Sequence, residues 1–120
     1  MNDRLDEERA AIEATYFGVM DIYEEKDIIV RNRTRQKTIK VQEGIKCALS
    51  KRNPTNVNMN DQYGDLDYTY EIFTYPNIKI RAGSIIRVSQ ESMDLELKNI
   101  GEPHIYPTHQ EIICHRKDKA

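Results

Sequence analysis

The fold is organised around a stretch that reads Asp67-Tyr-Thr-Tyr-Glu-Ile-Phe-Thr-Tyr75, then Pro76-Asn77, then Ile78-Lys-Ile-Arg-Ala-Gly-Ser-Ile-Ile-Arg-Val88. Apolar or aromatic residues alternate with polar ones on both sides of Pro76-Asn77, a pattern typical of half-buried strands. Gly83 supplies the positive φ that a tight turn needs. The stretch therefore predicts a strand, a corner and a hairpin, with its buried side chains at Tyr68, Tyr70, Ile72, Ile78 and Ile80.

Further strands are predicted on both sides by the same alternation. They cover residues 16–23, 28–41, 44–52, 93–100 and 109–116, with a turn at 31–34 and an interruption or exposed bulge at 24–27. The side chains expected to face inward are Ile45, Cys47, Leu49, Met93, Leu95 and Leu97. Residues 1–15 are polar and rich in helix formers, and their thin apolar stripe suits a helix that docks on the barrel or on another subunit.

These elements predict a mainly β fold, a small antiparallel β-barrel or sandwich with a short N-terminal helix and one long polar loop. The expected division is an N-terminal helix or arm at 1–15 and a β-barrel domain at 16–117. A chain of 120 residues is long enough to bury one core without disulfides or metal. It has no long apolar run and no charged-then-apolar leader, so we expect an intracellular protein.

Charge is segregated along the chain although the net charge is only -2. Residues 1–28 and 53–77 are acidic, whereas residues 29–52 hold eight bases and one acid. Alternating blocks of opposite sign suit head-to-tail contact between copies, although a solvated mixed surface explains them as well. The candidate subunit contacts are Arg31, Arg33, Arg35, Lys37, Glu24 and Glu25.

Motifs for catalysis or metal binding are absent from the sequence. There is no nucleophile elbow, phosphate loop or dinucleotide fingerprint, so we expect no enzyme activity and no small-molecule substrate. Cys114 and His115 are adjacent on a strand and point to opposite faces, and His104 and His109 flank a turn. The sequence therefore predicts no metal site and no cofactor, with Cys47 and Cys114 as buried apolar groups.

A small barrel with a basic segment at 31–52 also fits single-stranded nucleic-acid binding, because such a segment can follow a phosphate backbone. The chain is acidic overall, and no strand combines exposed aromatics with basic residues, which weakens this alternative. A barrel that recognises a protein partner is a third possibility.

Residues 53–65 form the longest stretch without periodicity, and their asparagines, proline and glycine exclude a regular element. In a domain of this size, a loop of such length is typically functional or disordered.

Four segments carry a resemblance to a known family: Asp21-Ile-Tyr23, Gly44-Ile-Lys-Cys-Ala-Leu-Ser50, Ile78 to Val88, and Tyr106-Pro-Thr-His-Gln-Glu-Ile112. In their order and spacing, the chain resembles the head-closure (stopper) proteins of tailed phages and of defective prophage particles in Gram-positive bacteria. The likeness spans most of residues 19–115 and leaves out the first fifteen. It implies a small β-barrel that assembles as a ring below the portal and adaptor rings, with a loop that reaches into the DNA channel.

The resemblance also implies the protein's surroundings and its channel residues. The expected partners are a portal or adaptor ring above, tail-completion or tail proteins below, copies of the chain itself and packaged DNA, with no membrane. The expected location is the virion neck, and the host cytoplasm during assembly. On this likeness the channel loop would contain Asn53, Val57, Met59, Asp61, Tyr63 and Asp65, and its lack of Lys and Arg would let DNA pass without tight phosphate contacts.

Overall fold

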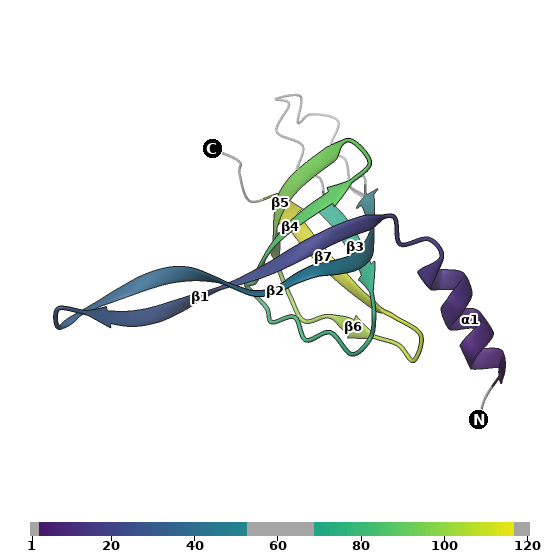
Figure 1. Ribbon diagram of the computed structural model, residues 1–120, viewed down its shortest axis with the longest axis horizontal. Helices are drawn as coiled ribbons and strands as arrows, with labels where there is room; N and C mark the ends of the chain where they lie inside the picture. The colour runs from purple at the N-terminus through teal and green to yellow at the C-terminus, as the bar shows by residue number, and fades with distance from the viewer. Residues whose placement is uncertain (1–2, 53–68, 117–120) are drawn as a thin grey trace, which may run out of the picture.

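The structure, a computed structural model, describes residues 3–52 and 69–116. In these two ranges the chain forms one helix and seven strands (Figure 1). Their bounds are α1 Asp3–Glu13, β1 Gly18–Val30, β2 Arg33–Arg52, β3 Thr69–Thr74, β4 Ile85–Gln90, β5 Met93–Asn99, β6 His104–Ile105 and β7 Gln110–Arg116. The predicted mainly β class with a short N-terminal helix is confirmed.

The strands form one antiparallel sheet that closes on itself, although not as a regular barrel. The order is β3-β2-β1-β4-β5-β7, and a further pairing of β3 with β7 completes the ring. The closure is uneven, because β3 and β7 align along six residue pairs whereas β5 and β7 share three. The short β6 was not predicted, and it pairs with the start of β7.

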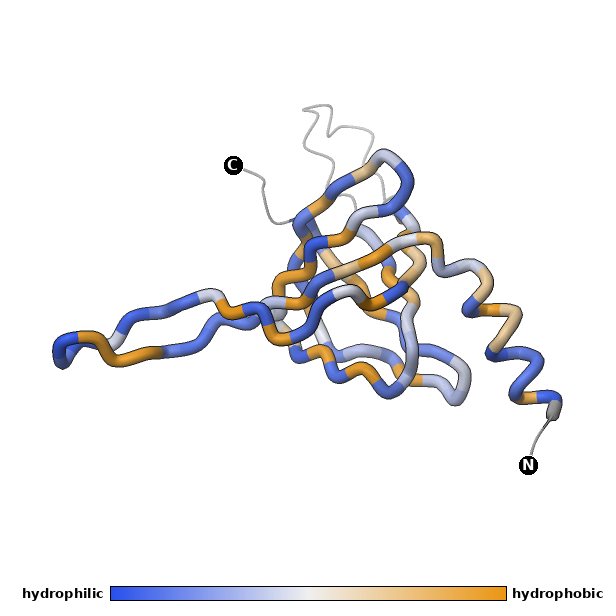
Figure 2. The backbone as a smooth tube through the Cα atoms, viewed as in Figure 1, coloured by the Kyte–Doolittle hydropathy of each residue, from blue (hydrophilic) through white to orange (hydrophobic). Residues whose placement is uncertain are grey.

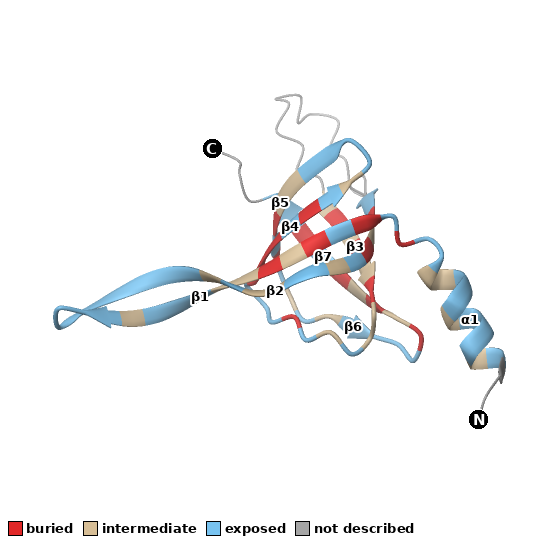
Figure 3. Ribbon diagram, in the orientation of Figure 1, coloured by how far each residue is buried: buried red, intermediate tan, exposed pale blue. Residues whose placement is uncertain are grey.

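The core lies inside this closed sheet, and buried residues alternate with less buried ones along β3 and β7 (Figure 3). Cys47, Leu49, Tyr70 and Ile72 are buried as predicted, and Leu97 is fully buried. Met93 is 43% exposed, so its predicted core position is wrong. It is the first residue of β5 and follows the turn at Glu91, where the β4–β5 hairpin extends past the core.

Residues 75–84 do not form the strand that was predicted at 78–81, although Ile80 is buried and Ile78 packs against the core. Their carbonyl groups accept hydrogen bonds from side-chain amides rather than from a neighbouring strand. The donors are Gln110 to Tyr75 and Ile78, Gln42 to Lys79, and Asn99 to Arg81. The predicted hairpin across Gly83 is therefore wrong: β3 pairs with β2 and β7, and β4 pairs with β1 and β5.

β1 and β2 form a single long hairpin that leaves the barrel (Figure 1). Residues 24–27 pair with β2 in unbroken register, so the predicted interruption or bulge there is wrong. Gly44 does not begin a new strand either, because β2 runs through it at a φ of 71°. The predicted turn is confirmed, with Arg31 and Asn32 both at positive φ, as a two-residue hairpin turn requires.

Helix α1 lies beside the barrel at the side opposite to the hairpin (Figure 1). Arg9 Nη2 donates a hydrogen bond to the carbonyl of Pro107 at 3.1 Å. Directly after the helix, the buried Tyr16 packs edge-on against Tyr75, with their ring centroids 5.4 Å apart. Tyr16 thus anchors the helix, most of whose surface is exposed (Figure 3).

Candidate interaction surfaces

The most prominent surface feature is the distal part of the β1–β2 hairpin, residues 24–40, which we name the arm. Its side chains are mostly hydrophilic, with a short apolar section close to the turn (Figure 2). Ile29 is 77% exposed and Val30 is 40% exposed. Large apolar side chains this far from the core gain little from the chain's own packing, which makes the end of the arm a candidate contact surface.

Charge on the arm is divided between its two faces. Paired residues of an antiparallel ladder share a face, and the register is regular from Tyr23↔Lys40 to Val30↔Arg33. The basic face carries Lys26, Arg33, Arg35 and Lys37 with Ile28, Val30, Ile39 and Glu24. The acidic face carries Glu25 and Asp27 with Ile29, Thr34, Gln36 and Thr38, and Lys40 lies on the same face at the base of the arm. The arm is therefore a two-sided ribbon with opposite charge on its two sides.

The predicted contact residues are brought together on the arm, but not on one face. Arg33, Arg35 and Lys37 share the basic face, and Arg31 lies in the turn. Glu24 and Glu25 point to opposite sides. Glu24 is held on the basic face by Lys26 at 3.8 Å and by Arg81 at 4.0 Å. The two glutamates lie on opposite faces because successive side chains of β1 alternate between the faces of the strand. The predicted interruption at 24–27 does not include this alternation.

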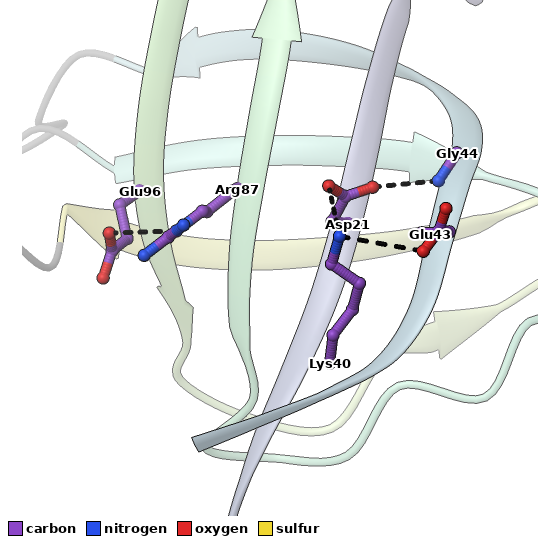
Figure 4. A network of polar contacts seen from close by, with 6 residues as sticks. All are labelled: Asp21, Lys40, Glu43, Gly44, Arg87 and Glu96. Carbon is purple, nitrogen blue, oxygen red and sulfur yellow. Dashed lines mark hydrogen bonds and ion pairs between the residues drawn. The ribbon is translucent and has the colours of Figure 1, made fainter.

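The base of the arm contains a polar network that sequence reasoning missed (Figure 4). Gly44 N–H donates to Asp21 Oδ1 at 2.9 Å, while Lys40 Nζ lies 3.7 Å from both Asp21 Oδ2 and Glu43 Oε1. The Tyr23 phenol, followed by these two carboxylates, raises the pKa of Lys40. No sequence motif marks this network, because its members come from two strands.

This network lies where the β1–β2 register shifts, between Met20 and Ile22 and again between Ile22 and Tyr23. Extra residues on one strand bend and twist a ladder. The bond from Gly44 to Asp21 satisfies a backbone donor that the bulge leaves without a strand partner. The network thus sets the direction in which the arm leaves the barrel.

A groove of about 630 Å³ runs between the base of the arm and the loop at residues 81–84. Charged groups of both signs line it, including Glu24, Asp27, Arg81 and Lys98. The ion pair of Glu24 with Arg81 crosses from the arm to this loop. The ion pair between Glu24 and Arg81 therefore connects the arm to the barrel.

Histidines and cysteines do not gather into a metal-binding cluster within residues 3–52 and 69–116. His104, Tyr106 and His109 instead stack on one another, with centroid distances of 4.8 and 4.9 Å, and His109 Nε2 lies 3.0 Å from Glu111 Oε2. Cys47 and Cys114 are fully buried free thiols, as predicted. In the same part of the chain, no helix has the length and apolar character needed to cross a membrane.

The predicted channel-loop residues lie outside the described residues. They are Asn53, Val57, Met59, Asp61, Tyr63 and Asp65, between the end of β2 and the start of β3. The same holds for Asp67 and Tyr68 at the start of the predicted strand. Their roles remain predictions from the sequence.

By fold, the chain is an antiparallel sheet that closes into a ring, preceded by an N-terminal helix, and two solved structures are similar to it in fold. One is the phage-like element PBSX protein XkdH of Bacillus subtilis, with a TM-score of 0.54, 12% identity and coverage of 83% of this chain and 93% of that one. Another is protein SF1141 of Shigella flexneri 2a, with a TM-score of 0.62, 18% identity and coverage of 85% and 93%. No protein-family model and no curated protein matches the sequence. At these identities, the likeness shows the fold.

Proposed function

We propose that this chain is a structural head-tail connector, a neck or stopper protein of a tailed phage or phage-like particle. It forms a ring under a portal or adaptor ring, joins tail proteins below and helps to close the DNA channel. Two lines support this proposal: the sequence resemblance to stopper proteins, and the shared fold with a protein of the phage-like element PBSX. The particle neck is then its final location, and the host cytoplasm its place of assembly.

The arm is the structural feature that gives the strongest support to ring formation. Thirteen of the seventeen residues at 24–40 are charged or polar, so the hairpin gains little hydrophobic stability by extending beyond the core. A two-stranded ribbon of this kind is marginal by itself. A neighbouring subunit that covers it would supply the missing contacts, and repeated contacts of this kind close a ring.

The channel role rests on residues 53–67, which the resemblance assigns to the loop that faces DNA. The loop contains no Lys or Arg and holds Asp61, Asp65 and Asp67. Such a loop stops DNA by its bulk while binding phosphates weakly, so that a later step can release the genome.

Single-stranded nucleic-acid binding is supported less well. Proteins of that kind combine cationic grooves with aromatic side chains on which bases stack. The basic face of the arm pairs its cations with Ile28, Val30 and Ile39 and contains no aromatic residue. This combination suits a protein surface better than nucleobases.

The test is to replace the chain in the producing strain with an arm-shortened variant. Replacing residues 26–37 by Asn-Gly keeps the Glu25↔Thr38 pair and gives a two-residue hairpin turn. We expect a folded protein and tailless heads that have lost their packaged DNA, seen by electron microscopy, because without the ring contact the channel is neither closed nor joined to a tail. Normal yields of joined particles after complete deletion of the gene would exclude the connector role, and normal yields with the shortened arm would exclude the arm as the ring contact.

A further inference from the structure

We infer that the basic face of the arm binds the acidic outer face of helix α1 from a neighbouring copy. This inference rests on the proposed ring and names the contact that joins one subunit to the next. The arm face is defined by Lys26, Arg33, Arg35 and Lys37.

The first observation is the orientation of α1. Leu5, Arg9 and Ile12 are half-buried, and Arg9 bonds to Pro107, so this side of the helix faces its own barrel. Asp6, Ala10 and Glu13 follow an i, i+4, i+7 spacing and form one stripe on another side, with Glu7 next to it. Asp6, Glu7 and Ala10 are exposed, and Glu13 is half-buried. The helix therefore presents carboxylates outward, with a small residue between them.

Most of these carboxylates have no cationic partner among residues 3–52 and 69–116. Glu8 pairs with Arg4 at 3.7 Å, but Asp6, Glu7 and Glu13 form no ion pair with another residue of the described ranges. Arg33, Arg35 and Lys37 on the arm likewise have no acidic partner there. Two unsatisfied charged surfaces of opposite sign remain on one molecule.

The two surfaces cannot meet within one copy, because the arm and α1 leave the barrel on opposite sides (Figure 1). The molecule measures 55 Å along its longest axis. Contact between them must therefore join two copies head to tail. A head-to-tail contact repeats from copy to copy and closes into a ring when its rotation allows.

The two surfaces also match in length. Alternate residues on a strand are about 6.7 Å apart, so the cations from Arg33 to Lys37 extend over about 13 Å. Asp6 and Glu13 lie about 10.5 Å apart along a helix axis. Ala10, between them, allows a close approach of the strand, while Ile28 and Val30 supply apolar contact between the cations.

Exposed ion pairs are individually weak and are screened by salt. The contact should therefore select the neighbour and its register while leaving free subunits largely separate. It becomes effective when a portal or adaptor platform holds the copies side by side.

A disulfide-trapping experiment tests this contact. One full-length chain carries Ala10→Cys, another carries Arg35→Cys, and the two are mixed at low ionic strength under mild oxidation. We expect a cross-linked heterodimer, whose yield falls several-fold at high salt. The native thiols do not interfere, because both are buried. The matched control replaces Arg35→Cys with Lys79→Cys, an exposed barrel position, and should give only background.

Charge reversal in the same assay tests specificity. Adding Arg33→Glu and Lys37→Glu to the arm chain, or Asp6→Lys and Glu13→Lys to the helix chain, should each reduce the cross-link several-fold. Combining the two altered chains should restore it, because opposite charges face each other again. A circular-dichroism spectrum of each altered chain checks that α1 and the barrel are retained.

A yield no higher than the Lys79→Cys control, or failure of the swapped pair to recover, would overturn the inference. A second outcome would also overturn it: charge reversal of the arm abolishes binding to a short DNA duplex but leaves the cross-link unchanged. The basic face would then bind nucleic acid. The connector role is retained after such a result if the arm-shortened variant still prevents the joining of heads and tails. The trapping result does not depend on particles, so the two proposals fail separately.

Discussion

Gln90 acts as a strand partner for Leu49 across the start of β1. Its Oε1 accepts a hydrogen bond from Leu49 N–H at 2.8 Å, and its Nε2 donates to the Leu49 carbonyl at 3.2 Å. β1 begins at Gly18, which pairs with Cys47 and with Gln90, so Leu49 lies beyond the reach of β1. The side chain passes over Gly18, where an added Cβ would lie 3.0 Å from Oε1. One amide thus extends the ladder past the end of a strand.

Replacing Gln90→Leu should therefore destabilise the barrel by about 2 kcal/mol, from two hydrogen bonds worth about 1 kcal/mol each. Urea unfolding followed by circular dichroism measures the change. Gln36→Leu, on the exposed acidic face of the arm, is the matched control and should change stability by about 0.5 kcal/mol or less. Equal effects of the two substitutions would show that the bonds to Leu49 contribute nothing.

Gly44→Ala should destabilise the protein by about 1 to 2 kcal/mol through backbone conformation alone. Its φ is 71°, and nothing lies within 4 Å of an added Cβ, so a clash is excluded as the cause. Gly101→Ala also enters open space, without a positive φ, and should be nearly neutral. Melting temperatures of the two variants make the comparison, and similar values would argue against strain at the base of the arm.

Stability should decrease as the pH rises from about 9 toward 12. Burial raises the pKa of Cys47 and Cys114 to about 12, and burial followed by Glu13 raises the pKa of Tyr16 to about 12. Above pH 9 the unfolded chain releases thiol protons that the folded chain keeps, so the unfolded state is favoured progressively. Below that pH both thiols are protonated in the folded and in the unfolded state, so their full contribution to stability is present.

Urea titrations at pH 7.5 and pH 10 measure this dependence. The variant with both Cys47→Ala and Cys114→Ala should lose less stability between the two pH values than the unmodified chain. If both proteins lose the same amount, the thiols are not the groups responsible. In the folded protein, iodoacetamide should modify neither thiol until urea is added.

Shortening residues 53–65 should preserve folding and ring assembly but let packaged DNA leak from the particle. The reason is the channel role that the resemblance assigns to this segment, with Val57 and Met59 as the residues that narrow the channel. Nuclease-sensitive DNA in assembled particles is the measurement, with residues 47–52 and 67–74 left unchanged. Normal DNA retention would remove the stopper role and leave the connector role intact.

Side-chain alternation in the sequence determined the buried residues of β2 and β3 that the structure describes. Cys47, Leu49, Tyr70 and Ile72 repeat with a period of two, and hydrophobic burial alone fixes their orientation. The Arg31-Asn32 turn was predictable for a similar reason, because turn formers interrupt the pattern there. The clustering of Arg33, Arg35 and Lys37 on one face follows from the same period.

Tertiary structure alone decided which segments pair and where regular pairing stops. Residues 78–81 alternate like a strand, yet the amides of Gln42, Asn99 and Gln110 bond their carbonyls from elsewhere in the chain. Conversely, residues 24–27 read as an interruption because they lack apolar side chains, yet backbone pairing with β2 needs none. Local sequence records the burial of side chains, whereas backbone hydrogen bonds depend on which distant donors and acceptors the closed sheet brings together.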